Sequence, residues 1–420
     1  MNLFVLSLAY LRERALNSLL NILLLAIGVA TITALILFSA QMRDRLAKDA
    51  RGIDLVVGAK GSPMQLILSS IYHVDVPTGN IPLAEAEALA RHPMVAAAIP
   101  LALGDNAAGF RIVGTVPDYP AHYGATPADG RLWQAPFEAT IGAEVARSTG
   151  WQLGDAFVGS HGLAGADFVH GDHPYRVVGV LARTGTVIDR LVLTSIESVW
   201  QVHDVEHRET EQPAHAGTAK PTADNDHDHD HPAEAADHDD REITSLLVRY
   251  RTPLAAVSMP REINSRSALQ AAAPALETAR LLTLVGAGLD TLRGFGLLLI
   301  ASAALGVFIA LYNATQQRRY DLAVMRSLGA SPAKLMGQVL LEALLLAAVG
   351  CVLGLAAGHA VTEVLGRLLP EAAAMGLTGL TWEPEEFLIV LLVLAVGVVA
   401  ALLPAVRAYR TDIAKTLATR

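Results

Sequence analysis

The chain has 420 residues, of which 52% are hydrophobic and only 17% are charged, a composition that favours a membrane protein. Its formal net charge of −9 at pH 7 argues against a nucleic-acid partner, which would favour a basic surface. The single cysteine, Cys351, excludes an internal disulfide and lies in an apolar run, where a free cysteine acts as a small hydrophobic side chain.

Four apolar runs are long enough to cross a bilayer, which takes about 20 helical residues. They cover residues 19–40, 295–312, 335–358 and 387–406. Arg and Lys gather before the first run, between the second and third, and after the fourth, whereas the segment between the third and fourth is mostly acidic. Because positive charge marks the cytoplasmic side, we expect both termini and residues 318–334 in the cytoplasm, and residues 41–294 outside.

The long segment between the first two spans has a mixed strand and helix pattern. Strand-like runs bounded by turn residues cover 54–59, 110–116, 175–181, 190–196 and 243–250, and helical spacing occurs in 83–93 and 138–150. The expected fold class is therefore an α-helical membrane protein with four transmembrane helices plus a large α+β extracytoplasmic domain between spans one and two, covering residues 51–274.

Helical periodicity continues past the membrane runs on both sides of this domain. It extends from the first span to about residue 50, and it starts near Pro274 ahead of the second span. Residues 275–312 would form a helix of about 55 Å, against a hydrocarbon core of about 30 Å. Residues 1–50 and 275–420 thus hold the four spans and two stalk helices, which either transmit motion or only attach the domain.

Residues 318–331 predict a short amphipathic helix at the cytoplasmic surface. Leu322, Met325 and Leu328 recur at helical spacing, Gly329 fits a helix stop, and Ser331 with Pro332 fits the start of the next helix. Such a helix either lies on lipid headgroups or docks a partner protein.

The third span contains small residues and one carboxylate. Gly350, Gly354 and Gly358 are spaced for close helix packing, either within the chain's own bundle or at a dimer seam. A carboxylate inside a membrane is a functional candidate by default. Glu342 lies near the cytoplasmic edge, however, so we expect it to snorkel or to pair with a nearby Arg.

Residues 224–242 contain four histidines and nine carboxylates, within a His- and Asp-rich loop at 203–242. Imidazole nitrogen with carboxylate oxygen suits Zn²⁺ and related cations, and alternate residues of an extended chain share one face. The candidate metal ligands are His227, His229, His231, His238, Asp226, Asp228 and Asp230. The alternative is a solvated acidic insertion without a metal role. Two weaker candidates are the cluster of His161, His170, Asp172 and His173, and the pair of His73 with Asp75.

Several segments resemble one known family. Residues 316–335, "QQRRYDLAVMRSLGASPAKL", look like the coupling segment of the MacB/FtsX/LolC–LolE (type VII) ABC transporter permeases. The layout of one span, a large outer domain and three further spans is similar too, as are residues 141–157, 177–199, 340–358 and 402–417.

The resemblance implies a multi-pass permease of the bacterial inner membrane with a periplasmic domain, working with a second permease copy as a homodimer or as half of a heterodimer. A separate ABC ATPase would bind ATP and dock on the coupling segment, at Asp321, Leu322, Met325, Arg326, Leu328 and Gly329. The chain has no P-loop, so we expect no enzyme activity and no intrinsic cofactor.

The expected function is to couple ATP hydrolysis to mechanical work outside the membrane, for export or extraction of a substrate with a periplasmic or outer-membrane partner. Two alternatives remain open. One is zinc handling linked to the His-rich loop. The other is activation, without transport, of a periplasmic partner such as a cell-wall hydrolase.

Overall fold

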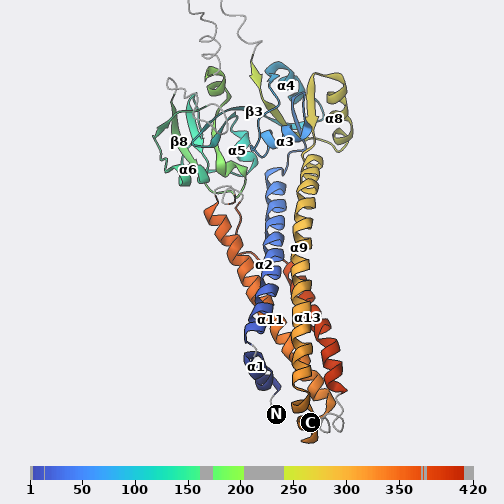
Figure 1. Cartoon of the computed structure of the whole chain (residues 1–420). Coiled ribbons are helices and arrows are strands. Elements are labelled where there is room, and N and C mark those ends of the chain that lie inside the picture. The colour runs from blue at the N-terminus through green and yellow to red at the C-terminus, as the bar shows by residue number, and fades with distance from the viewer. Residues whose placement is uncertain are drawn as a thin grey trace, which may run out of the picture. The chain divides into compact units, whose positions relative to one another are not determined.

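The computed structural model describes residues 3–13, 15–160, 174–202, 241–369, 372 and 376–410. These residues form two compact units, one of residues 1–44 with 283–420 and one of residues 45–282. The sequence placed the domain boundaries at residues 50 and 274. The structure assigns residues 45–50 and 274–282, the outer ends of the two long helices (Figure 1), to the domain unit, and Leu46 and Ala50 pack against its core.

The domain unit is built on a ten-stranded sheet with the order β12-β1-β11-β3-β4-β9-β6-β8-β5, with β7 paired to β8. The strands are β1 (Leu55–Ala59), β3 (Val95–Ala107), β4 (Phe110–Thr115), β5 (Pro127–Gly130), β6 (Glu138–Ile141), β7 (Ala156–Phe157), β8 (Tyr175–Leu181), β9 (Leu191–Ser195), β11 (Ser245–Tyr250) and β12 (Leu269–Ala272). The β4–β9 and β6–β8 pairs are parallel and the others are antiparallel. A separate pair joins β2 (Ile81–Pro82) to β10 (Glu242–Ile243).

Both faces of this sheet are covered. Val56 packs in one core cluster with α3 (Pro63–Ser70), whereas its neighbours Leu55 and Val57 pack in another with α4 (Leu83–Ala90) and α8 (Ala255–Arg266). Successive strand residues point to opposite faces, so a strand buried on both sides reads as a continuous apolar run. The remaining helices of the unit are α5 (Asp118–His122), α6 (Ala143–Thr149) and the 3-10 helix η1 (Val187–Arg190).

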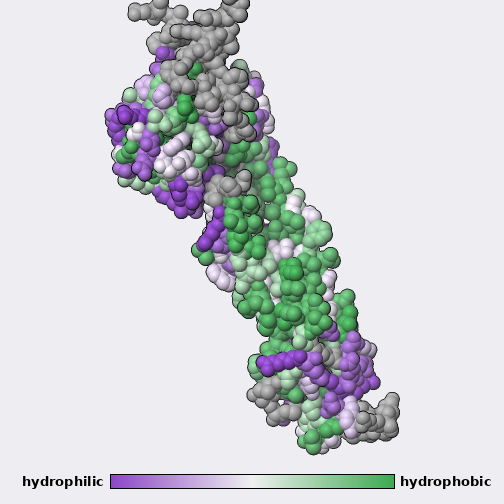
Figure 2. Space-filling view, turned by 60° about the vertical axis from the view of Figure 1, so that its left-hand side comes forward, coloured by the Kyte–Doolittle hydropathy of each residue, from purple (hydrophilic) through white to green (hydrophobic). Residues whose placement is uncertain are grey.

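The helical unit contains the predicted spans. Its helices are α1 (Leu3–Glu13), α2 (Ala15–Asp49), α9 (Pro274–Gln317), α10 (Arg319–Ser327), α11 (Pro332–Leu368) and α13 (Glu385–Tyr409), with α2 and α9 continuing into the domain unit. Four of them, α2, α9, α11 and α13, are long and apolar enough to cross a membrane. Figure 2 shows a broad hydrophobic surface over these helices. The predicted fold class is confirmed.

Two local predictions differ from the structure. The helical spacing in residues 138–150 is wrong for its first part, because Glu138–Ile141 pairs as β6 with β8 and β9 before α6 begins. The longest strand, β3, was not predicted. Its alanine-rich sequence with Pro100 lacks a strand signal of its own, and β11 and β4 pair with it on both sides.

Candidate functional site

The predicted coupling segment forms the helix α10 between two spans. Gly329 ends the helix with φ of +95°, a left-handed conformation that a side chain disfavours. The Ala330 amide donates to the Met325 carbonyl and the Gly329 amide to the Arg326 carbonyl, both at 3.0 Å. These are the two bonds of a Schellman cap. Ser331 is extended and Pro332 opens α11, as the sequence predicted.

The residues of α10 divide between two faces. Leu322 is buried in a cluster with Leu335 and Val339, and Met325 packs against the same cluster. Asp321 and Gly329 are exposed, and Leu328 is 82% exposed. Arg326 is half-buried. The sequence pattern did not single out Tyr320, which is 47% exposed beside Asp321.

Arg318 joins this helix to the bundle. Its guanidinium lies 3.5 Å from the centre of the Tyr10 ring, 3.7 Å from the Glu342 carboxylate and 3.6 Å from the Glu13 carboxylate. The Arg318 side chain is only 11% exposed, and that of Glu342 is 8% exposed. Glu342 therefore has the arginine neighbour expected for it. The start of α10 is fixed to α1 and α11 through one buried cation.

The three glycines of α11 lie against α2 of the same chain. A Cβ at Gly350 would lie 2.8 Å from the Leu25 side chain, and one at Gly354 would lie 2.5 Å from Val29. At Gly358 it would lie 2.7 Å from Thr33. Contacts this short exclude any side chain, so in this structure the glycine run packs the chain's own bundle.

Polar contacts join three spans at the outer end of the helical unit. The Gln41 side chain of α2 donates to the Thr378 carbonyl at 2.7 Å and accepts from the Thr378 amide at 2.9 Å. His359 of α11 contacts the Gly379 carbonyl at 2.6 Å and the Glu386 carboxylate of α13 at 2.8 Å. We call these contacts, made by Gln41, His359, Thr378, Gly379 and Glu386, the outer clasp. Sequence reasoning missed it, although His359 is the one histidine outside residues 41–294.

A second polar cluster fixes the end of α2 inside the domain unit. Arg45 donates to the carbonyls of Gly185 and Thr186 at 3.0 Å each, and it pairs with Asp49 at 3.4 Å. Asp49 accepts from the Val187 amide of η1 at 2.7 Å. The α2 helix thus ends in a charged contact with the domain rather than in a free linker.

Tyr72 links the two long helices at the same place. Its hydroxyl lies 2.6 Å from the Thr278 hydroxyl of α9 and 3.4 Å from the Leu46 carbonyl of α2. We call the contacts of Arg45, Asp49 and Tyr72 the stalk joint. All of these contacts lie within the domain unit, to which the ends of α2 and α9 belong.

The described residues contain no group of three or more His, Cys, Asp or Glu side chains that could hold a metal. The predicted ligands His227, His229, His231, His238, Asp226, Asp228 and Asp230 lie outside the described residues. Of the weaker candidates, His161, His170, Asp172 and His173 also lie outside the described residues. His73 is buried and its Nε2 lies 2.9 Å from the Tyr119 hydroxyl, so it belongs to the core.

Four apolar helices with an α+β domain after the first define a multi-pass membrane protein with one large domain outside the bilayer. Comparison with known families gives two matches. The MacB-like periplasmic core domain matches residues 18–227, and the FtsX-like permease C-terminal family matches residues 293–413. The chain belongs to the MacB/FtsX-type permeases of ABC transporters.

Solved structures show a weaker likeness. The periplasmic region of MacB from Actinobacillus actinomycetemcomitans is 11% identical with a TM-score of 0.33, and the match covers 56% of this chain and 97% of that one. The extracellular domain of the ABC-type transporter YknZ from Gram-positive bacteria is 11% identical with a TM-score of 0.30, covering 52% and 98%. At these TM-scores the likeness to the two structures supports no conclusion about this chain. No curated protein matches the sequence.

Proposed function

We propose that this chain is the membrane subunit of an ATP-driven system of the bacterial inner membrane, and that it converts ATP hydrolysis by a separate ATPase into motion of its periplasmic domain. A second copy of the chain completes the permease as a homodimer. The motion serves export or extraction of a substrate from the outer side. The chain itself neither binds nor hydrolyses ATP.

The exposed face of α10 is the observation that carries this proposal. Leu328, at the C-cap of this short helix between two spans, is 82% exposed, so the described residues of the bundle leave its side chain almost uncovered. Asp321, Tyr320 and Gly329 flank it on the exposed side. An apolar anchor with a polar rim is the usual form of a protein-docking site.

The buried face of α10 supports transmission rather than simple attachment. Leu322 and Met325 hold the helix in the bundle, and Arg318 fixes its start to α1 and α11. A push on the exposed face therefore moves the spans with it. At the other ends of α2 and α9, the stalk joint delivers that movement to the domain.

Leu328→Asp tests the docking face. An anchor residue of this kind contributes about 2 kcal/mol or more to binding, so we expect at least a roughly 30-fold weaker complex and loss of ATPase stimulation. Leu380→Asp is the matched control, since Leu380 is 76% exposed in the segment between α11 and α13. Retention of the ATPase by the Leu328 variant would contradict the docking assignment.

Leu322→Asp is not an equivalent test, because it would bury a carboxylate in the cluster that holds α10. Loss of the ATPase in that variant would report unfolding of the helix. The conservative change Leu322→Met, by contrast, should preserve the complex.

Zinc handling is a second candidate, favoured by the His- and Asp-rich residues 224–242. Ligands of this type capture Zn²⁺ with loose geometry, so the loop would collect a cargo ion or sense it. Activation of a periplasmic hydrolase without transport would use the same motion, and only the partner on the outer side would differ.

A further inference from the structure

Hydrogen bonds show where the His359 ring carries its protons. Nδ1 lies 2.6 Å from the Gly379 carbonyl oxygen, which can only accept, so Nδ1 carries a proton. Nε2 lies 2.8 Å from a carboxylate oxygen of Glu386, and two lone pairs at that distance would repel each other, so a second proton lies between them. Imidazole is the stronger base, with an ordinary pKa of about 6.5 against about 4.3 for Glu. His359 is therefore an imidazolium beside the Glu386 carboxylate.

Removal of this second proton costs one of the two contacts. A neutral imidazole has one N–H and one lone pair. If the N–H of His359 faces the Gly379 carbonyl, the lone pair of the ring faces the Glu386 carboxylate, and the two repel each other. If the N–H faces Glu386 instead, the Gly379 carbonyl loses its donor. Both contacts persist only while the ring keeps both protons.

The pair is enclosed by its neighbours. The Glu386 side chain is 2% exposed and that of His359 is 14% exposed. The second Glu386 oxygen accepts from the Glu383 amide at 3.0 Å, and the Trp382 ring lies beside the imidazole with their centres 4.7 Å apart. A buried carboxylate that loses its partner is strongly unfavourable, so loss of the proton should open the contact. Trp382 itself is 71% exposed, which leaves the proton a short route to solvent.

The His359 contact helps to hold the segment that joins α11 to α13. Gln41 of α2 contacts the amide and the carbonyl of Thr378. Glu363 of α11 accepts from the Thr378 hydroxyl and from the Gly379 amide. A Cβ at Gly379 would overlap the His359 carbonyl, so the segment lies directly on α11. The protonation of the His359 ring therefore affects how firmly this segment is attached.

Other charged side chains act on the pair through space. They are Glu363 and Arg367 of α11, Glu383 and Glu385 next to Glu386, and Arg43 and Asp44 of α2, which interact electrostatically with Glu383. Both ring nitrogens and both Glu386 oxygens already have partners. The surrounding charges thus help to set the pH at which the proton leaves, without replacing it.

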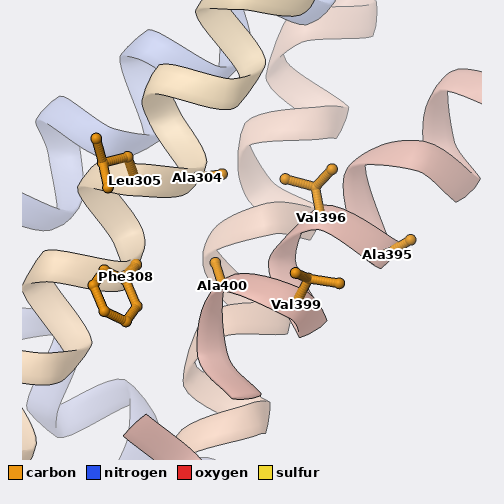
Figure 3. Close-up of a pocket in the computed structure, with 7 residues that line it drawn as sticks. All are labelled: Ala304, Leu305, Phe308, Ala395, Val396, Val399 and Ala400. Atoms are coloured by element: carbon orange, nitrogen blue, oxygen red, sulfur yellow. The ribbon is translucent and has the colours of Figure 1, made fainter. Parts of the chain in front are cut away.

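The cavity between α9 and α13 offers no second source of a pH response. Its volume is about 370 Å³, and Figure 3 shows its lining. The lining residues are all apolar: Ala304, Leu305, Phe308, Ala395, Val396, Val399 and Ala400. A lining of this kind has no group that binds a proton.

We propose that His359 and Glu386 form a proton-binding site at the outer end of the helical unit, and that the bound proton holds the connection between α11 and α13 in place. Release of the proton loosens the Gly379 contact. The connection therefore tightens as the outer compartment becomes more acidic and loosens as its pH rises. This site belongs to the chain alone and does not depend on the proposed ATPase partnership.

Glu386→Gln separates the contacts from the proton. The introduced amide has the shape of the carboxyl group, and its N–H can donate to Nε2 of a neutral His359 while its oxygen accepts from the Glu383 amide. This variant keeps both ring contacts without the second proton. His122→Gln is the matched control, since His122 lies in the domain unit and its Nε2 contacts the Arg51 carbonyl at 2.8 Å.

Two measurements on the full chain in lipid nanodiscs follow the site between about pH 6 and pH 9, around the range in which histidine titrates. Trp382 fluorescence, taken as the difference from Trp382→Phe in each background, reports the charge on the adjacent ring, because an imidazolium quenches indole fluorescence. Hydrogen exchange at the Thr378 and Gly379 amides, corrected for the intrinsic effect of pH, reports how firmly the segment is held.

In the unmodified chain and in His122→Gln, Trp382 fluorescence should increase as the pH rises. Exchange at the Thr378 and Gly379 amides should become at least about tenfold faster, the effect of losing one hydrogen bond to a charged group. In Glu386→Gln both signals should stay constant, with exchange as slow as in the unmodified chain at low pH.

An equal pH response in the unmodified chain and in Glu386→Gln would overturn the proton site, as would a flat response in the unmodified chain. Should Glu386→Gln fail to fold, His359→Gln gives the same decision, because a pH response that persists without the imidazole overturns the proposal. None of these results would bear on docking of the ATPase at α10.

Discussion

His73 is a buried titratable residue of the domain whose surroundings predict an effect of pH on stability. It lies in the left-handed region with φ of 53°, and its ring is buried against Tyr119. Burial, together with a smaller effect of the nearby guanidinium groups of Arg111 and Arg190, lowers the pKa of His73 to about 3. The folded domain therefore keeps this imidazole neutral at pH values where the unfolded chain protonates it.

The domain should lose stability as the pH falls below about 6.5, the usual pKa of His. Between pH 7 and pH 5 the unfolded state gains the proton and the folded state does not, which costs about 2 kcal/mol of unfolding free energy. His73→Asn removes the titration and tolerates the left-handed backbone, so its stability should fall less over that range.

Tryptophan fluorescence during denaturant unfolding measures this effect. Trp133, Trp151 and Trp200 lie in the domain unit, and Trp382→Phe removes the signal of the helical unit. An equal loss of stability on acidification in the His73 variant would contradict the assignment of the effect to this ring.

At the scale of a helix, α11 contains two glycines with opposite requirements. A Cβ at Gly354 would lie 2.5 Å from the Val29 Cβ and 2.8 Å from the Ala26 carbonyl, whereas a Cβ at Gly337 meets nothing within 4 Å. Gly354→Ala should therefore destabilise the bundle by about 1–3 kcal/mol through overpacking. Gly337→Ala, in the same helix, should stabilise it by up to about 1 kcal/mol.

Thermal unfolding of the two variants in one detergent gives the comparison. Since helix propensity favours alanine at both positions, only the contact with α2 separates them. A similar melting temperature for both variants would show that α11 does not approach α2 at Gly354.

The same elements show how far sequence reasoning reaches. The spans, the long ends of α2 and α9, and the Gly329 stop follow from apolar periodicity and local backbone preference, so they were predicted. The β3 strand and the β6 strand are stabilised by neighbours distant in sequence, and no local pattern reveals such pairing. The burial of Leu322 was missed because periodicity marks an apolar face without telling whether it meets the bundle or a partner.

The outer clasp was missed for a related reason. Gln41 and Thr378 are 337 residues apart, and each is an ordinary polar residue at the end of an apolar run. His359 and Glu386 gave a slightly stronger signal, as a single histidine and a carboxylate at opposite ends of one acidic segment. Their pairing still required knowledge of which spans are neighbours.

At the scale of the whole molecule, the stalk joint holds the ends of α2 and α9 inside the domain unit. Tyr72→Phe removes the hydroxyl that contacts Thr278 and the Leu46 carbonyl, a loss of about 1 kcal/mol. We expect ATPase docking to be unchanged and hydrogen exchange around Thr278 to increase. The amount of substrate exported or extracted per ATP hydrolysed should fall, because the Tyr72 hydroxyl no longer holds α9 at the stalk joint.

Tyr250→Phe is the matched control, since the Tyr250 hydroxyl is buried without a hydrogen-bond partner among the described residues. It should leave exchange around Thr278 as it is in the unmodified chain. Equal exchange in the Tyr72 and Tyr250 variants would show that the hydroxyl contact does not hold α9.

We predict that the His- and Asp-rich residues 203–242 make ATP turnover of the complex sensitive to Zn²⁺. Zn²⁺ is titrated into the reconstituted permease–ATPase complex while ATP turnover is measured, with the unmodified chain, with residues 213–241 deleted, and with His227, His229, His231 and His238 changed to Asn. Imidazole binds zinc far better than a side-chain amide does. If the loop captures zinc for function, ATP turnover changes at low micromolar zinc only in the unmodified chain, and the length-preserving Asn variant behaves like the deletion.

A response lost on deletion but kept in the Asn variant would assign the effect to loop length or to its carboxylates. A flat response in all three would leave lipids, lipoproteins or peptides as the substrates to test, with the transmission path through α10, α9 and the stalk joint unchanged.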